Sequence, residues 1–233
     1  LSTGAVGAVA FFILTTTVMR TWHLSWPGLQ PHWSGDFNWG IFAGLVVVDI
    51  IFMALNTGEM PRLHRANWDF TLSAFEAAVM EETLFRFAIL GILFYAWRNV
   101  KQRLPLALAT SSILFGIVHL TNYGPQEWSM TVLQAVSAAG IGLFFATVYV
   151  YTGQLWLAMV MHFLLDWTAF IASDSTLMTG KVTVQNWIGT GIELVVFIGI
   201  AVWMMFGQRR QVMERHVNRL TGEHQRFDFM IQY

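Results

Sequence analysis

Long apolar stretches alternate with short polar segments along most of this chain. A helix needs about 20 mostly apolar residues to cross the hydrocarbon core of a bilayer. The stretches that approach this length are residues 4–20, 39–56, 72–97, 104–120, 130–151, 154–171 and 187–206. They do not show the two-residue alternation of a β-barrel strand. The pattern therefore predicts an all-α, polytopic transmembrane bundle of about seven spans.

Composition supports a protein that lies in lipid. Of the 233 residues, 55% are hydrophobic and only 12% are charged, and the mean hydropathy is +0.53, whereas a soluble domain carries roughly 25% charged residues. The net charge of −1 gives no basis for a nucleic-acid partner. Because the chain has no cysteine, disulfides, thiolate metal sites and cysteine nucleophiles are excluded.

The distribution of basic residues predicts the orientation of the bundle, since lysine and arginine gather on the cytoplasmic side. In a seven-span arrangement nine fall on the side of the C-terminus, and three, Arg62, Arg65 and Lys181, fall on the other. The nine are Arg20, Arg98, Lys101, Arg103, Arg209, Arg210, Arg215, Arg219 and Arg226. We therefore expect the C-terminus to lie in the cytoplasm. We further expect the membrane to be that of a prokaryotic cell.

The polar C-terminal segment contains one amphipathic stretch. Between Gln208 and Leu220, the residues Val212, Met213, Val217 and Leu220 fall near one face among arginines. Such a helix is suited to lie on anionic lipid. A solvated tail with a positive anchor is an equally good interpretation at this stage.

Ionisable residues inside the predicted spans are the main candidates for chemistry. Each costs a few kcal/mol near the bilayer centre on insertion scales, so it requires a partner, water or a function. They are Asp49, Glu76, Glu81, Glu82, Arg86, His119, His162, Asp166 and Glu193. Asp49, Glu76 and Glu193 are interpreted as structural or water-facing.

Helical spacing pairs several of these side chains. Glu82 and Arg86 are four residues apart and lie on one helix face, so they predict an ion pair. Glu81 is rotated by about 100° from Glu82 and faces elsewhere, as a carboxylate able to accept a proton.

The same spacing joins a histidine to a neighbour on two other helices. Asp166 lies one turn from His162 and can fix the orientation of its imidazole. Phe115 lies one turn from His119, where its ring is expected to pack beside the imidazole. We expect Glu81, His119, His162 and Asp166 to line one cavity, although His119 lies about 10 Å nearer the outer end.

Three motifs resemble those of the CPBP (CAAX protease and bacteriocin-processing) family of intramembrane glutamate endopeptidases. Residues 81–86 match E-E-x-x-x-R, residues 115–119 match F-x-x-x-H, and residues 162–166 match H-x-x-x-N/D, in the family's order. The resemblance implies a four-helix catalytic core over residues 72–171. Around it, residues 1–71 form N-terminal spans and a linker, 172–207 a last span and 208–233 a cytoplasmic tail.

The resemblance also implies a role for each motif residue. Glu81 and His119 activate the attacking water, and His162 and Asp166 stabilise the oxyanion. Glu82, Arg86 and Phe115 support the site. The family's prototype has Asn where this chain has Asp166, so this carboxyl should be neutral or should hold His162 as a donor.

Several functions stay open at the level of sequence. By resemblance, the substrate is a membrane-associated protein or peptide, in some branches prenylated, and the reaction is CAAX-type processing or peptide maturation without a cofactor. Alternatives are a zinc hydrolase with His119, His162 and Glu81 as ligands, a proton-coupled transporter, and a catalytically silent immunity protein. The H-E-x-x-H, G-x-G-D and G-x-S-G motifs of other intramembrane proteases are absent.

Overall fold

A computed structural model describes residues 3–22, 24, 37–57, 65–178 and 180–221 of the chain. Over these residues the structure is helical, without strands beyond one isolated bridge between Tyr123 and Gln126. The helices are α1 (Thr3–Thr21), α2 (Trp39–Thr57), α3 (Trp68–Glu82), the π-helix η2 (Thr83–Ile89), α4 (Leu90–Ala96), α5 (Arg103–Val118), the 3₁₀-helix η3 (His119–Asn122), α6 (Trp128–Thr152), α7 (Leu155–Ser173), α8 (Val184–Met204) and α9 (Gly207–Leu220).

The predicted helical membrane bundle is confirmed, and each predicted span corresponds to helical structure. The helices of five spans are long and apolar enough to cross a membrane: α1, α5 with η3, α6, α7 and α8. The second span is the shorter apolar helix α2. The third is a continuous helical run in which α3, η2 and α4 follow one another without a break, and it carries the charged motif.

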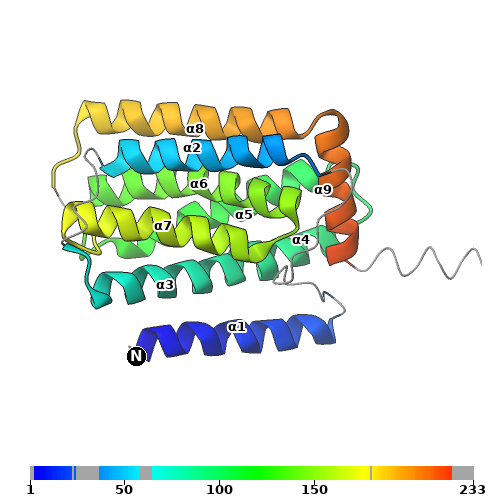
Figure 1. Ribbon diagram of the computed structural model, residues 1–233, viewed down its shortest axis with the longest axis horizontal. Helices are drawn as coiled ribbons and strands as arrows, with labels where there is room; N and C mark the ends of the chain where they lie inside the picture. The colour runs from blue at the N-terminus through cyan, green and yellow to red at the C-terminus, as the bar shows by residue number, and fades with distance from the viewer. Residues whose placement is uncertain (1–2, 23, 25–36, 58–64, 179, 222–233) are drawn as a thin grey trace, which may run out of the picture.

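The spans run side by side, with α6 in the interior and α1 at the edge against α3 (Figure 1). Helix α6 packs against α5, α7 and α8, and most of its second half is buried. Gly116 allows the close approach of α5, because a Cβ at this position would lie 2.6 Å from the carbonyl oxygen of Ala135. Small residues serve this purpose generally in membrane helix pairs.

Local sequence fixes several helix ends. Asn67 caps α3 by accepting a hydrogen bond from the Phe70 N–H at 2.8 Å. Thr183 and Asn186 form a reciprocal capping box at the start of α8. Gly153 ends α6 with φ of +66°, a left-handed conformation that favours glycine. These caps supply partners for backbone groups that a helix end leaves unpaired.

Lipid contact, one of the two interpretations of the C-terminal stretch, is not what the structure shows for its apolar face. Helix α9 crosses the end of the bundle (Figure 1) and packs on α6 and α8. Val212, Met213, Val217 and Leu220, the four residues of the predicted face, are all buried in the main core cluster. The apolar face of α9 packs on the ends of α6 and α8, so these helices cover it and lipid does not.

Arg62, Arg226 and the remainder of the tail from residue 222 lie outside the described residues. The membrane orientation inferred from the basic residues therefore stays a prediction.

Candidate active site

The first motif lies where the third span changes from α-helix to π-helix. Glu81 and Glu82 are the last residues of α3, and Arg86 lies within η2. Isolated π turns are rare and are frequent at functional sites. The charged motif therefore occupies an irregular part of an otherwise regular membrane helix.

Glu82 connects the first and third motifs. Its Oε2 lies 3.0 Å from Arg86 Nε, so the predicted ion pair is present. This contact is close without the alignment of a hydrogen bond. The other oxygen, Oε1, accepts a 2.8 Å hydrogen bond from His162 Nδ1. Glu82 is fully buried and thus joins an arginine of its own helix run to a histidine of α7.

Arg86 is held on two further sides. Its Nη2 donates to the backbone carbonyl of Gly142 at 3.4 Å, and its guanidinium carbon lies 4.2 Å from the centre of the Phe115 ring. An aromatic face attracts a cation, and more strongly where water is excluded. The buried charge therefore has contacts with a carboxylate, a carbonyl and an aromatic ring.

His162 presents its second nitrogen to two carboxylates. Nε2 lies 3.7 Å from Glu81 Oε2 and 3.4 Å from Asp166 Oδ2. The expected proximity of Asp166 to His162 is therefore present. Glu82 is an additional orienting partner, bonded to Nδ1 at the other side of the ring, and the orienting role of Asp166 stays a prediction. Asp166 lies on the same side of the ring as Glu81.

His119 lies at the junction of α5 and η3, and its ring is bonded to its own helix. Nδ1 is 2.8 Å from the Phe115 carbonyl oxygen. Because a carbonyl only accepts, Nδ1 carries the proton, which leaves Nε2 to take or give another one. The helix changes to 3₁₀ geometry at His119, and the imidazole lies near enough to Glu81 for their charges to interact, despite the predicted difference in depth.

Phe115 contacts the side chains of all three motifs. Its ring meets His119 edge-on at 4.8 Å and His162 edge-on at 6.0 Å, and it supports Arg86. The predicted packing of Phe115 beside His119 is thus observed. Gly142 on α6 makes room for this ring, since a Cβ there would lie 2.8 Å from Phe115 Cδ1.

Sequence reasoning missed two neighbours of His162 that come from other helices. The Phe145 ring of α6 lies 5.4 Å from the imidazole. Asp49 on α2 is only 5% exposed, and α2 packs against α7, the helix that carries His162. Its position inside a span was the available signal, but only the packing of α2 against α7 shows which group it approaches.

The other intramembrane acids lie outside this cluster of contacts. Glu193 of α8 accepts hydrogen bonds from Ser137 Oγ of α6 at 3.2 and 3.1 Å. Glu76 of α3 lies against Gly4 of α1, where a Cβ would come within 1.8 Å of its Oε2. Both agree with a structural interpretation.

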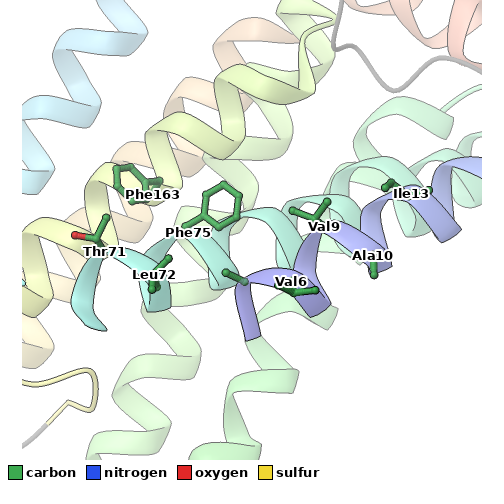
Figure 2. A pocket seen from close by; sticks show the side chains of 9 residues that line it. Val6, Val9, Ala10, Ile13, Thr71, Leu72, Phe75 and Phe163 are labelled. Atoms are coloured by element: carbon green, nitrogen blue, oxygen red, sulfur yellow. The ribbon is translucent and has the colours of Figure 1, made fainter. Parts of the chain in front are cut away.

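An apolar groove opens between α1, α3 and α7. It has a volume of about 640 Å³ and is lined by Ala5, Val6, Val9, Ala10, Ile13, Thr71, Leu72, Phe75 and Phe163 (Figure 2). Phe163 follows His162 in the sequence, so one wall of the groove belongs to the same turn of α7 as the site. The lining has the chemistry of a hydrocarbon-binding surface.

Among the described residues, no set of three or more His, Asp or Glu side chains has an arrangement that could hold a metal ion. His162 has Glu82 at one nitrogen and two carboxylates near the other. The absence of a cofactor stays a prediction.

The helical bundle makes this chain a polytopic membrane protein, and three of its spans bring together a cluster of carboxylates and imidazoles supported by an arginine. Residues 64–168 match the family model of type II CAAX prenyl endopeptidase Rce1-like proteins. This segment contains all three motifs, and the match supports the resemblance to the CPBP/CAAX protease family. No curated protein and no solved structure gives a significant match. The general activity associated with this domain is that of a CAAX-type intramembrane endopeptidase.

Proposed function

We propose that the protein hydrolyses a peptide bond of a membrane-associated substrate with water activated by Glu81 and His119. One observation carries this assignment. Glu81 Oε2 has no hydrogen-bond partner within the described structure, although it lies 3.7 Å from His162 Nε2. A base next to a donor is what general acid–base hydrolysis requires.

The reaction needs no covalent enzyme intermediate. The water oxygen bonds to the scissile carbonyl carbon while its proton passes to Glu81, and the carbonyl π electrons move onto oxygen. When the carbon–nitrogen bond breaks, the leaving nitrogen takes that proton back. His119 helps to activate the water through Nε2, because its Nδ1–H already donates to the Phe115 carbonyl oxygen.

His162 and Asp166 stabilise the oxyanion in this proposal. With its Nδ1–H donating to Glu82, His162 acts as an imidazolium, whose Nε2–H is directed toward the developing charge. Asp166 lies beside that nitrogen, where an ionised carboxylate would repel an oxyanion. In this proposal Asp166 therefore either donates as a neutral carboxyl, in the place of the amide that the family's prototype has, or holds His162 as the donor.

The proposed substrate is the C-terminal region of a membrane-associated protein or peptide, with or without a lipid group. The apolar groove beside Phe163 supports a substrate with a hydrocarbon portion, because its lining is almost wholly apolar (Figure 2). CAAX-type processing and peptide maturation both fit this chemistry. We place the protein in a prokaryotic cell membrane, and the distribution of basic residues supports a cytoplasmic C-terminus.

The function is tested by comparing the membrane proteomes of cells that carry wild-type protein, Glu81→Ala or Glu193→Gln. Uncleaved precursors should accumulate with Glu81→Ala and not with Glu193→Gln, which changes a buried acid away from the site. Identical proteomes in all three strains would favour a catalytically silent protein or a transporter.

The zinc alternative is separated by metal content and chelation. A zinc hydrolase would hold about one zinc per chain, lose turnover on chelation and regain it with zinc. We expect turnover to survive exhaustive chelation, since Arg86 lies among the groups that would surround the ion and would repel it. Stoichiometric zinc with chelator-sensitive turnover would replace the proposed mechanism.

A further inference from the structure

The π-helix η2 contains a wide turn whose backbone accepts a hydrogen bond from a side chain of α5. In a regular α-helix the Phe85 carbonyl would accept from the N–H of residue 89, four positions later. Here the Leu90 N–H, five positions later, is directed at Phe85 O. A π turn adds about one residue to the helix and so shifts the register of everything before it against everything after it.

That shift lets two buried faces coexist on the third span. Before the turn, Ala74, Ala78 and Glu82 are buried, and after it Leu90 and Phe94 are buried in the core. If the turn relaxed to α-helical geometry, one set would rotate by about 100° relative to the other. Glu82 would then move away from His162, or the buried face of α4 would leave the core.

Ser111 of α5 bonds directly to this turn. Its Oγ–H donates to the Phe85 carbonyl oxygen at 2.9 Å, and the side chain is only 1% exposed. Phe85 lies next to Arg86 in sequence, and its ring meets Phe115 at 5.0 Å. The hydroxyl therefore holds the backbone of the first motif from the same helix that carries the second.

The neighbouring serine provides a natural comparison. Ser112 is also buried, at 4% exposure, but its Oγ donates to the Leu108 carbonyl of its own helix at 2.7 Å. Removal of either hydroxyl deletes one buried hydrogen bond and one oxygen atom. Only the Ser111 bond crosses to η2.

We propose that Ser111 is a positioning residue for the active site, which stabilises the π turn and thereby sets Glu81, Glu82 and Arg86 against His162. The expected effect of Ser111 on turnover rests on the proposed hydrolytic function. The structural part of the inference, a side-chain hydrogen bond that holds the turn, is independent of any activity.

The structural part is measured by solid-state NMR on full-length protein in lipid. The dipeptide Phe-Arg occurs once in the sequence, at Phe85-Arg86. Labelling phenylalanine with ¹³C at the carbonyl and arginine with ¹⁵N therefore gives a single correlation from the Phe85 carbonyl. Loss of a hydrogen bond moves a carbonyl carbon signal upfield. The signal should move in Ser111→Ala and stay in place in Ser112→Ala.

The functional part is measured as the turnover of the same two variants, with a precursor that the wild-type protein cleaves as the substrate. Ser111→Ala should lower kcat by about tenfold or more with little change in KM, because misplaced catalytic groups lose rate rather than substrate binding. Ser112→Ala should stay within about twofold of wild type. Thermal unfolding of both variants controls for general loss of stability.

Each outcome has one meaning. An unmoved Phe85 signal in Ser111→Ala overturns the proposal whatever the activity. A moved signal with the same kcat as Ser112→Ala shows that the bond holds the turn without positioning the site, and also overturns it. If Glu81→Gln proves fully active, the hydrolytic mechanism fails, while the NMR comparison still decides whether Ser111 holds the turn.

Discussion

Glu82 and Glu193 are both buried carboxylates in membrane helices, yet their surroundings differ in kind. Glu82 lies between Arg86 and His162, with contacts of 3.0 and 2.8 Å. Glu193 accepts from the hydroxyl of Ser137 at 3.2 and 3.1 Å. A buried acid that faces a hydroxyl forms a hydrogen bond between two helices and nothing more. A buried acid that contacts charged groups on two helices also orients those groups. The difference separates a site from a packing contact.

The largest effect is expected beside this network, at Glu81. Glu81→Gln keeps the shape of the side chain but removes its ability to take a proton, so kcat should fall by about 10³-fold or more. The thermal unfolding temperature should stay near that of wild type, because Glu81 Oε2 has no hydrogen bond to lose in the described structure. A single-turnover assay in detergent or nanodiscs measures the rate, and wild-type activity would remove Glu81 as the base.

Glu82→Gln should damage both activity and stability. The substitution leaves Arg86 buried without its counterion, which costs about 3 kcal/mol or more when one partner of a buried pair is removed. It also replaces the carboxylate that accepts from His162 Nδ1 with a neutral amide oxygen, which holds the imidazole less strongly. Chemical unfolding in mixed micelles gives the stability change. An unchanged midpoint would show that the Glu82–Arg86 pair does not hold the third span.

His216 of α9 extends the comparison to a buried titratable group at the end of the bundle. Its Nδ1 donates to the Val150 carbonyl at 3.0 Å. Burial lowers the pKa of His216 from 6.5 to about 4, and the charges of Arg219 and Arg215 act in the same direction. As the pH falls, His216 in the unfolded chain therefore binds a proton at a higher pH than His216 in the folded protein does. The stability from the neutral imidazole is complete above pH 6.5 and is lost as the pH falls toward 4.

This dependence is isolated by comparing wild type with His216→Gln across pH. The difference in unfolding free energy between the two proteins should change by about 3 kcal/mol at most between pH 7 and pH 4, in the direction that weakens wild type at acid pH. Parallel pH profiles would show that His216 is not buried as a neutral imidazole between α9 and α6.

The smallest effect is expected at Glu193. Gln keeps an oxygen that can accept from Ser137, and interhelical hydrogen bonds of this kind contribute about 0.6 kcal/mol on average. Glu193→Gln should therefore change stability by less than about 1 kcal/mol and leave turnover intact. A loss of activity as large as that of Glu82→Gln would remove the distinction between the two buried acids.

The sequence by itself determined the parts of this protein that depend on one helix at a time. Apolar length located the seven spans, because the thickness of the bilayer sets the length of any helix that crosses it. Helical periodicity determined the pairs Glu82–Arg86, Phe115–His119 and His162–Asp166, because residues four apart share a face whatever the rest of the chain does.

Tertiary structure decided everything that depends on two helices at once. The spacing of the motifs contains no information on which nitrogen of His162 meets Glu82, on the approach of Asp49 to that ring, or on the bond from Ser111 to the π turn. The same holds for α9, whose apolar face was evident while the surface that covers it was not. Contacts between helices follow from how their faces pack, and packing is a property of the whole bundle.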